Sequence, residues 1–350
     1  MDDVLFLTGL GGLLFFLLGW GFKNLPKERW QMLAVVPLKK HDGGSWLGAN
    51  LTYYGFFIAT SQLMALMLLM VLLYSANISI TGAVLATVVV LLFSLPAARL
   101  VAMIVENKRH TFTIGGASFV GIVVAPWAIM LTSKLHWHDS VLHMPMIPML
   151  AAMSIAYTLG EGLGRLGCIS YGCCYGRPID ECRPVLKKIF SRMNFIFYGD
   201  NKKVAYEARL HGRKLIPIQA VTCILYCLGA LVGSYMFLHG FFTQALLFTM
   251  MLTQLWRILS ETMRADFRGF SRISTYQKMG LISVVYMLAV CYFVSAPPQI
   301  IPEIARGMHI LWNPGVIVGL QALWLIFFFT FGRSTVTSST VSFTLIKEHI

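Results

Sequence analysis

The chain has 350 residues, of which 57% are hydrophobic and only 12% are charged, and its mean hydropathy is +0.70. A soluble protein of this size could not cover its surface with so few charged residues. The formal net charge of +13 would suit nucleic acid, but the basic residues lie in loops beside apolar segments, where anionic lipid explains them better. The composition therefore predicts an all-α, polytopic transmembrane helical bundle and argues against nucleic acid as a partner.

Nine apolar runs follow one another along the chain, each long enough to cross about 30 Å of hydrocarbon as a helix. They are predicted at 4–22, 51–74, 78–105, 112–133, 147–170, 216–239, 241–262, 279–296 and 309–332. The first run is preceded by Asp2 and Asp3 instead of the basic residues of a signal peptide, and no small-residue cleavage site follows it. We therefore expect it to be retained as a membrane helix.

The polar connections are few and mostly basic. A linker at 23–50 joins the first two runs, and a Ser/Thr-rich tail follows the last one. The only sizeable insert, 171–215, carries ten Lys and Arg residues and is predicted to form a small basic cap over anionic lipid. Within it, the apolar run 194–198 is expected to pack against the cap or the membrane surface.

The stretch from Gly160 to Arg177 is the most unusual in the chain. It combines several glycines with two arginines and three cysteines at the end of an apolar run. Glycine lets a backbone approach another backbone or a ligand closely. An ionisable residue at such a depth favours a functional role. The stretch is therefore the first candidate for a binding or catalytic site.

This stretch also carries a resemblance to a known family. The run GRLGCISYGCCYGR, Gly164 to Arg177, resembles the signature of the prolipoprotein diacylglyceryl transferase family. Further elements follow the family's order along residues 50–296. They are Tyr54-Gly55, Ala98-Arg99-Leu100, Gly115 to Phe119, Pro217 with Gln219, and Arg257, Glu261 and Arg264 in an R-x3-E-x2-R pattern.

The resemblance implies a seven-helix core at 50–296, with the cap 171–215 inserted in it. Residues 1–49 and 297–350 would then add one membrane helix at each end. The implied activity is transfer of a diacylglyceryl group from phosphatidylglycerol to a lipoprotein cysteine in the bacterial cytoplasmic membrane, without a cofactor. Non-catalytic phospholipid binding or lipid transport on the same fold is the alternative, and a scaffold role is a third.

Arg165 and Arg257 match the family's arginines that hold the lipid phosphate, and we expect them to be catalytic. A guanidinium offers a planar set of donors that fits phosphate and does not lose its charge. The alternative is a structural ion pair with a carboxylate four residues away, Glu161 for Arg165 or Glu261 for Arg257. An arginine that is paired in this way could still bind phosphate, so the two interpretations are compatible. The remaining expected substrate-binding residues are Tyr54, Arg99, Glu161, Gly164, Gly176, Gln219, Glu261 and Arg264.

The sequence departs from the family pattern at three positions. Val120 stands where the family has a histidine, Cys168 replaces an asparagine, and Cys173 replaces a glutamate. A valine cannot transfer a proton, so the acceptor could be a lipoprotein cysteine or another thiol, hydroxyl or amine.

Cys168, Cys173, Cys174 and Cys182 form a C-x4-C-C-x7-C pattern. This is not a zinc spacing, and adjacent cysteines do not easily bind one ion, so no metal is expected. A disulfide or small-residue packing is favoured, and a reactive thiol is the alternative for Cys168, Cys173 and Cys174.

A histidine-rich loop contains His136, His138, Asp139 and His143. These side chains could hold a metal ion. Alternating crossings, however, place this loop on the membrane face opposite the cap, so a solvated interfacial loop is favoured.

The two membrane faces differ strongly in charge. Nearly all loop Lys and Arg residues, including those of the cap, fall on one face. Charge bias would place that face in the cytoplasm, whereas the resembled family has its active site on the outer side. Both orientations stay open at this stage.

Overall fold

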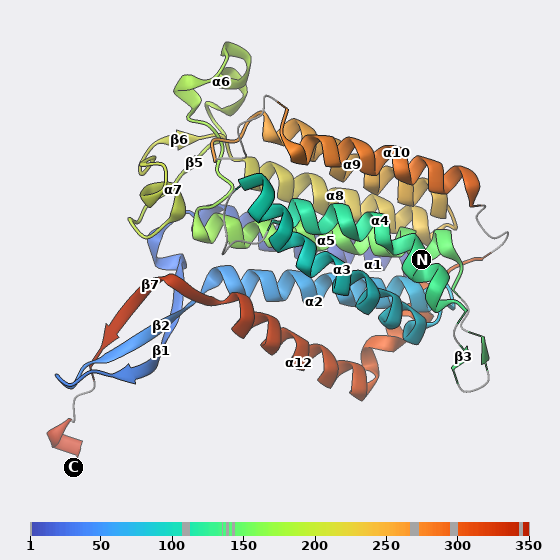
Figure 1. The fold of residues 1–350 in the computed structure, drawn as a ribbon, viewed down its shortest axis with the longest axis horizontal. Helices are drawn as coiled ribbons and strands as arrows, with labels where there is room; N and C mark the ends of the chain where they lie inside the picture. The colour runs from blue at the N-terminus through green and yellow to red at the C-terminus, as the bar shows by residue number, and fades with distance from the viewer. Residues whose placement is uncertain are drawn as a thin grey trace.

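The computed structural model describes residues 2–106, 113–134, 136–137, 140–141, 144–266, 273–294, 300–342 and 346–349. Within these residues, nine long helices run along the longest axis of the molecule, with α12 inclined to the others (Figure 1). They are α1 (Asp2–Asn24), α2 (Tyr53–Ser75), α3 (Ile80–Glu106), α4 (Ile114–Thr132), α5 (Met146–Tyr171), α8 (Ile218–Leu238), α9 (Phe242–Glu261), α10 (Thr275–Phe293) and α12 (Pro314–Phe331). The predicted all-α polytopic bundle is confirmed.

Eight of these described helices are long and apolar enough to cross a membrane. The exception is α9, which corresponds to the predicted segment 241–262 and is made more polar by residues such as Gln244, Gln254 and Arg257. It packs against α5, α8 and α10, and it buries Gln254 together with two threonines. The helix is therefore present where the sequence predicts it, but it lies inside the bundle with its polar face covered.

The central helix is α5, which packs against α2, α8 and α9. Its glycines allow these close contacts. A Cβ on Gly167 would lie 3.0 Å from the backbone oxygen of Tyr54 in α2, and one on Gly162 would lie 2.9 Å from Cβ of Tyr226 in α8. Much of the glycine-rich pattern is thus explained by helix packing.

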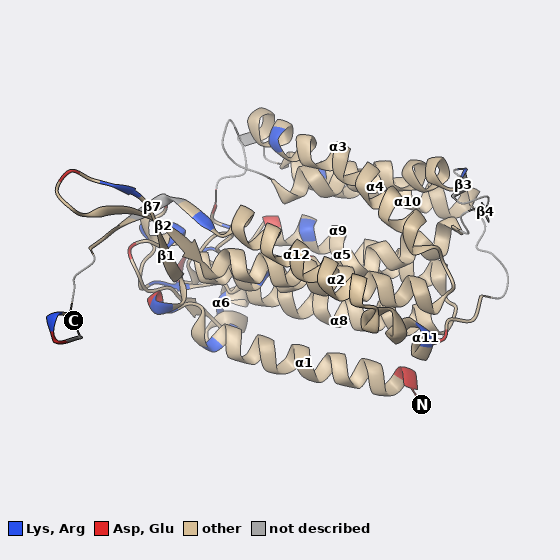
Figure 2. Cartoon of the chain, turned by 90° about the horizontal axis from the view of Figure 1, so that it is seen from below, with Lys and Arg blue, Asp and Glu red and all other residues tan. Residues whose placement is uncertain are grey.

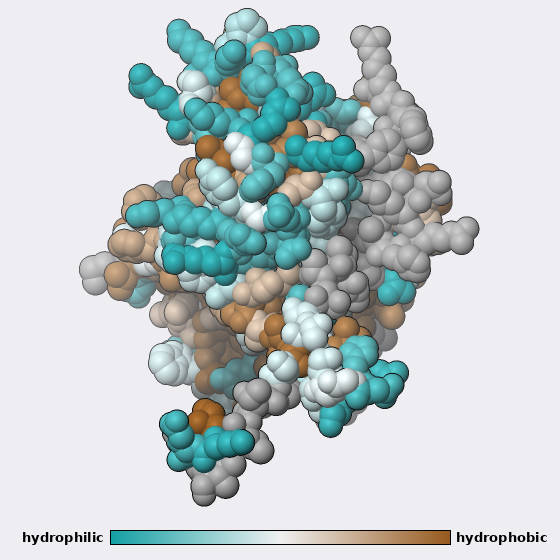
Figure 3. All heavy atoms as spheres, turned by 90° about the vertical axis from the view of Figure 1, so that its left-hand side faces the viewer, coloured by the Kyte–Doolittle hydropathy of each residue, from teal (hydrophilic) through white to brown (hydrophobic). Residues whose placement is uncertain are grey.

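The basic insert forms a cap over one end of the bundle (Figure 1). Its elements are η2 (Ile179–Glu181), α6 (Pro184–Phe190), β5 (Phe195–Ile196), α7 (Lys203–Tyr206) and β6 (Lys214–Leu215). Seen from that end, the surface over the cap is mostly hydrophilic (Figure 3), and Lys and Arg gather there (Figure 2). Phe195 and Phe197 are buried, and the ring of Phe195 lies 6.2 Å from that of Phe22 in α1, so the apolar run 194–198 packs as expected.

A three-stranded antiparallel sheet projects from the same end (Figure 1). Its order is β1 (Met32–Lys40), β2 (Trp46–Thr52), β7 (Arg333–Val341). The sequence analysis did not predict these strands in the linker and the tail. The sheet is joined to the bundle by Thr52, whose N–H and hydroxyl both donate to the backbone oxygen of Gly332 at 2.9 Å.

The remaining described elements are short. They are η1 (Glu28–Trp30), β3 (His136–Trp137), β4 (Ser140–Val141), α11 (Ile304–His309), η3 (Ile310–Trp312) and η4 (Lys347–His349). Strands β3 and β4 lie at the end of the bundle opposite the cap (Figure 1).

A buried lysine ties the cap to two helix ends. Lys202 is fully buried, and its Nζ donates to the backbone oxygens of Leu25 at 3.2 Å and Ser170 at 2.6 Å. These oxygens lie at the C-terminal ends of α1 and α5, where donors are needed. Burial lowers the pKa of Lys202 to about 7, against a smaller opposing effect of Glu28. A neutral amine still has two N–H groups, one for each oxygen.

This burial predicts a pH dependence of stability. Between pH of about 7 and 10, folded Lys202 has lost its proton while the unfolded side chain still binds one, so the free energy of unfolding should rise with pH. The slope for one proton is at most about 1.4 kcal/mol per pH unit. Thermal unfolding of the wild type and Lys202→Met, measured in detergent across this range, should diverge as the pH rises. Parallel curves would contradict this account.

The packing of α5 gives a second prediction. A side chain at Gly162 would overlap Tyr226 and the backbone of Cys227, so Gly162→Val should destabilise the protein by roughly 1–3 kcal/mol. Gly12 in α1 has no atom within 4 Å of an added Cβ, and Gly12→Val is the matched control. Thermal midpoints in detergent compare the two. An equal effect of both variants would show that the α5–α8 contact does not need glycine.

Candidate functional site

A polar stripe runs along one face of α5. Tyr157, Glu161, Arg165 and Cys168 follow at spacings of four, four and three residues, which places them on the same side of a helix. Glu161 and Arg165 expose only 4% and 13% of their side chains. The stripe is therefore a line of polar and charged groups inside the bundle.

Glu161 binds two arginines at once. Its carboxylate accepts from Nη2 of Arg257 in α9, at 2.9 Å for Oε1 and 2.8 Å for Oε2, and from Nη2 of Arg165 one turn along α5. Arg257 exposes 11% of its side chain. Of the two pairs considered from the sequence, Glu161–Arg165 is present. Glu261 instead forms its ion pair with Nη1 of Arg264 at 4.0 Å, and Arg257 turns to α5.

Two neutral hydroxyls complete this cluster, and the sequence analysis missed both. Nη1 of Arg257 donates to Oγ of Ser118 in α4 at 2.6 Å, and Nη2 donates to Oη of Tyr157 at 2.8 Å. The Tyr157 hydroxyl in turn donates to Glu161. Tyr157 could have been found from its spacing of four residues before Glu161. Ser118 lies within the Gly115 to Phe119 motif.

The charges of this cluster do not cancel. Arg165 and Arg257 share the single carboxylate of Glu161, which leaves one positive charge in a buried environment. In addition, Nε of Arg165 is buried and has no hydrogen-bond partner among the described residues. A buried donor without a partner is costly. The cluster is therefore suited to bind a group with one negative charge and acceptor oxygens.

Arg264 is bound to a different carboxylate. Its Nε and Nη2 donate to the two oxygens of Asp266 at 2.8 and 2.7 Å, and the side chain is only 8% exposed. Its backbone pairs with Gly176, and its oxygen accepts from Nε of Arg177 at 3.3 Å. The arginine thus fastens the segment after α9 to the segment after α5.

The other expected binding residues surround the end of α5 less closely. Nε2 of Gln219 donates to the oxygen of Cys173 at 2.8 Å, while its Oε1 is buried and has no hydrogen-bond partner among the described residues. Tyr54 is half-buried, and its hydroxyl is close enough to interact electrostatically with Cys173 and Arg165.

Three of the expected substrate-binding residues lie outside the charged cluster of Glu161, Arg165 and Arg257. Gly164 faces α2, where an added Cβ would lie 3.4 Å from Oγ of Ser61, and Gly176 packs against Ile216. Arg99 is exposed on α3. Their roles in substrate binding stay predictions.

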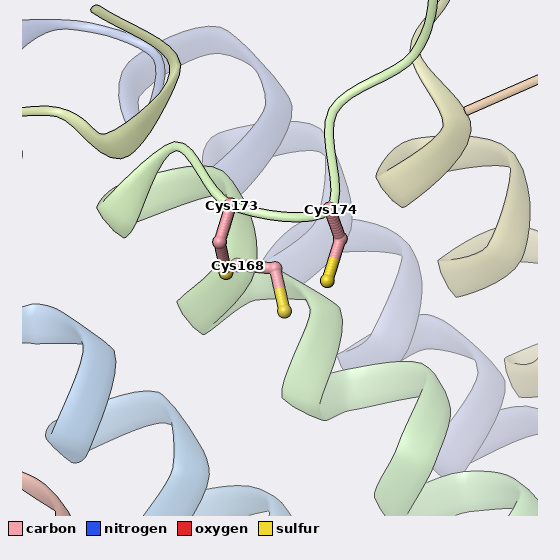
Figure 4. Close-up of side chains that lie close together, drawn as sticks. All are labelled: Cys168, Cys173 and Cys174. Carbon is pink, nitrogen blue, oxygen red and sulfur yellow. The ribbon is translucent and has the colours of Figure 1, made fainter. Parts of the chain in front are cut away.

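The structure gathers Cys168, Cys173 and Cys174 in the turn after α5. Their sulfur atoms all lie within 4.8 Å of one another, and the side chains point toward a common space (Figure 4). All seven cysteines, each of which is described, are free thiols. The sequence favours a disulfide or small-residue packing and makes it difficult for the adjacent pair to bind one ion, whereas the structure brings all three sulfur atoms together without a disulfide.

Cys182 and the histidine-rich loop do not belong to this group of thiols. Sγ of Cys182 donates to the oxygen of Pro178 within the cap. In the histidine-rich loop, His138, Asp139 and His143 lie outside the described residues, and His136 belongs to β3 at the opposite end of the bundle.

Comparison with known proteins identifies one similarity. A family model described as prolipoprotein diacylglyceryl transferase matches residues 45–296. No curated protein and no solved structure matches the chain. The matched range includes α2 to α10 and all members of the charged cluster.

Glu161 should be essential for folding as well as for the site. Glu161→Gln leaves Arg165 and Arg257 buried without a compensating charge, which should cost about 3–5 kcal/mol. Glu303→Gln removes a carboxylate from an exposed pair with Arg306 and should change little. Thermal midpoints in detergent separate these outcomes. Equal midpoints for both variants would mean that the buried charges are screened by another group.

Proposed function

Because the chain belongs to the prolipoprotein diacylglyceryl transferase family, we propose that it moves a diacylglyceryl group from phosphatidylglycerol to an acceptor in the membrane. The observation that carries this proposal is the surplus positive charge of the cluster formed by Arg165, Arg257 and Glu161. A phosphodiester carries one negative charge and would neutralise it. The unpartnered Nε of Arg165 would donate to a phosphate oxygen.

The depth of the cluster fits a lipid headgroup. Arg257 lies four residues before the end of α9, and Arg165 lies six residues before the end of α5. At 1.5 Å per residue, the arginines are about 6–9 Å below the cap end of the bundle. A phospholipid in the surrounding leaflet would therefore present its phosphate near the level of the two guanidinium groups.

The transfer breaks one bond and forms one. The acceptor nucleophile attacks the glycerol carbon of the diacylglycerol moiety, the bond between that carbon and the phosphate oxygen breaks, and glycerol phosphate leaves. Negative charge grows on the leaving phosphate, and Arg165 and Arg257 stabilise it there. Glu161, Tyr157 and Ser118 hold Arg257 in place, so little reorganisation is needed during the reaction.

A lipoprotein cysteine is the proposed acceptor, as in the family. Its thiol must lose a proton before or during the attack. Val120, which stands where the family has a histidine, cannot accept that proton. This substitution favours the second candidate function, a phospholipid-binding or lipid-transport protein that keeps the anion site without turnover. The two functions differ in whether glycerol phosphate is released.

We place the protein in the bacterial cytoplasmic membrane, again by family. The arginine cluster and the cap lie toward the same end of the bundle, so the site serves one membrane face (Figure 1). That end also carries most of the Lys and Arg residues (Figure 2). Anionic headgroups and a leaving glycerol phosphate would both be attracted to it.

Headgroup release tests the proposed reaction. Purified protein in phosphatidylglycerol liposomes, with a cysteine-bearing lipoprotein peptide, should release glycerol phosphate and lipidate the peptide. Arg165→Ala and Arg257→Ala should each lower the rate by about 100-fold or more, as expected for loss of a group that stabilises transition-state charge. Arg213→Ala is the control, because Arg213 is exposed in the cap and pairs with Asp180 there.

The outcomes distinguish the two candidate functions. Phosphatidylglycerol that binds in an Arg257-dependent manner without release of glycerol phosphate would favour lipid binding or transport. If neither binding nor release depends on the two arginines, the proposed anion site is wrong.

A further inference from the structure

The three thiols after α5 have a geometry close to that of a metal site. Zinc–sulfur bonds of about 2.3 Å in a tetrahedral arrangement hold sulfur atoms roughly 3.8 Å apart. The sulfurs of Cys168, Cys173 and Cys174 are all within 4.8 Å of one another, so inward shifts of about 1 Å or less would close the set around one ion. Cys173 and Cys174 are half-buried, which leaves a path for the ion.

The backbone of the turn aims these side chains. Gly172 has φ 73°, its N–H donates to the oxygen of Cys168 at 2.9 Å, and the N–H of Cys173 donates to the same oxygen at 3.1 Å. This Schellman motif ends α5 and brings Cys173 back over Cys168. It accounts for two of the thiols through helix termination alone.

The third thiol needs a separate explanation. Cys174 has φ 56°, in the left-handed region that costs a non-glycine residue about 1–2 kcal/mol. This conformation turns its sulfur toward the other two instead of away from them (Figure 4). A strained backbone that points a reactive side chain into a cluster favours a functional role.

The charges around the cluster also fit a metal ion. Three thiolates and one divalent ion carry a total charge of −1. Arg165 lies one turn before Cys168 on α5, where its guanidinium would offset this negative charge. A disulfide would join only two of the three sulfur atoms. It would not explain why the third side chain also points toward them.

We propose that Cys168, Cys173 and Cys174 bind one thiophilic metal ion, with Zn²⁺ as the expected ion, through three thiolates. Soft thiolate ligands select Zn²⁺ and Cu⁺ over hard cations. Three protein ligands leave the fourth position of zinc open, which is the arrangement of catalytic zinc sites.

The use of the open position rests on the proposed transferase function. An acceptor thiol that binds zinc loses its proton to water as the zinc–sulfur bond forms, because a coordinated thiol is deprotonated. The bound sulfur then attacks the glycerol carbon, leaves the metal, and glycerol phosphate departs. Such a site activates a cysteine without a histidine and so suits a chain with Val120 at that position.

Metal binding is tested without any lipid. Reduced, metal-free, full-length protein in detergent is titrated with Zn²⁺, and with Co²⁺ as a spectroscopic probe. We expect one ion per chain and thiolate-to-Co²⁺ charge-transfer bands. Cys168→Ser, Cys173→Ser and Cys174→Ser should each weaken Zn²⁺ binding by more than about 100-fold, beyond the loss caused by removing an outer-shell partner. Cys182→Ser, in the cap, should bind as the wild type does. Binding unaffected by the first three variants would overturn the proposal.

A second measurement uses the unaltered protein, in case a variant does not fold. Zn²⁺ should protect Cys173 and Cys174 from alkylation by a maleimide, while the labelling rate of Cys182 stays constant. Equal labelling of all three with and without Zn²⁺ would also overturn the site.

The open position has its own test. A cysteine-bearing peptide should change the spectrum of the Co²⁺-loaded protein, whereas the same peptide with serine should not. No change with either peptide would mean that the fourth position does not take an acceptor thiol. Since neither spectrum depends on lipid, metal binding without glycerol phosphate release would refute the transferase and keep the metal site. Release that persists in metal-free protein would refute the use of the metal and keep the transferase.

Discussion

The carboxylate of Glu161 is the constraint around which the centre of this protein is built. Two arginines from different helices meet on it, and each would otherwise carry an uncompensated charge inside a membrane. Because Glu161 and Arg165 belong to α5 and Arg257 to α9, the cluster fixes how these helices face one another. Ser118 extends the same network to α4. A polar network that joins three helices in this way favours one arrangement of them over others that apolar packing alone would allow.

Three features of the surrounding structure hold α5 in position. Glycines bring α2 and α8 close to it, a Schellman turn ends it, and Lys202 of the cap donates to the backbone oxygen of Ser170 in its last turn. The glycine contacts, the Schellman turn and the lysine hydrogen bond all act on the same helix within a few turns of one another. The result is a line of polar groups held in place near the cap end of α5. The charged cluster and the three thiols are neighbours at this end of α5, so the proposed anion site and the proposed metal site lie over one helix end.

The sequence predicts those features of the fold and the site that depend on neighbouring residues, and it does not predict contacts between residues far apart in the chain. Apolar runs reveal membrane helices because each run satisfies its own backbone hydrogen bonds. Motif spacing predicts Arg165 and Arg257 as site residues, and the structure brings both to Glu161. The pairing of Arg257 with Glu161, 96 residues earlier, is tertiary, and the local alternative Glu261 is equally well spaced on its helix. The sequence leaves Cys174 as a possible reactive thiol, and its left-handed backbone, which places it beside the other two thiols, is not visible there. No local sequence pattern predicts a left-handed backbone conformation for a cysteine.

The sheet β1–β2–β7 has a consequence for the order in which the molecule can be assembled. Strand β2 and its partner β7 lie far apart in the sequence, and the contact between Thr52 and Gly332 spans 280 positions. Proteins are made from the N-terminus, so β2 keeps an unpaired edge until β7 has been made. The helices between the two strands must therefore be made before the sheet can close. A chain that stops before β7 leaves one edge of β2 open at the cap end of the bundle (Figure 1).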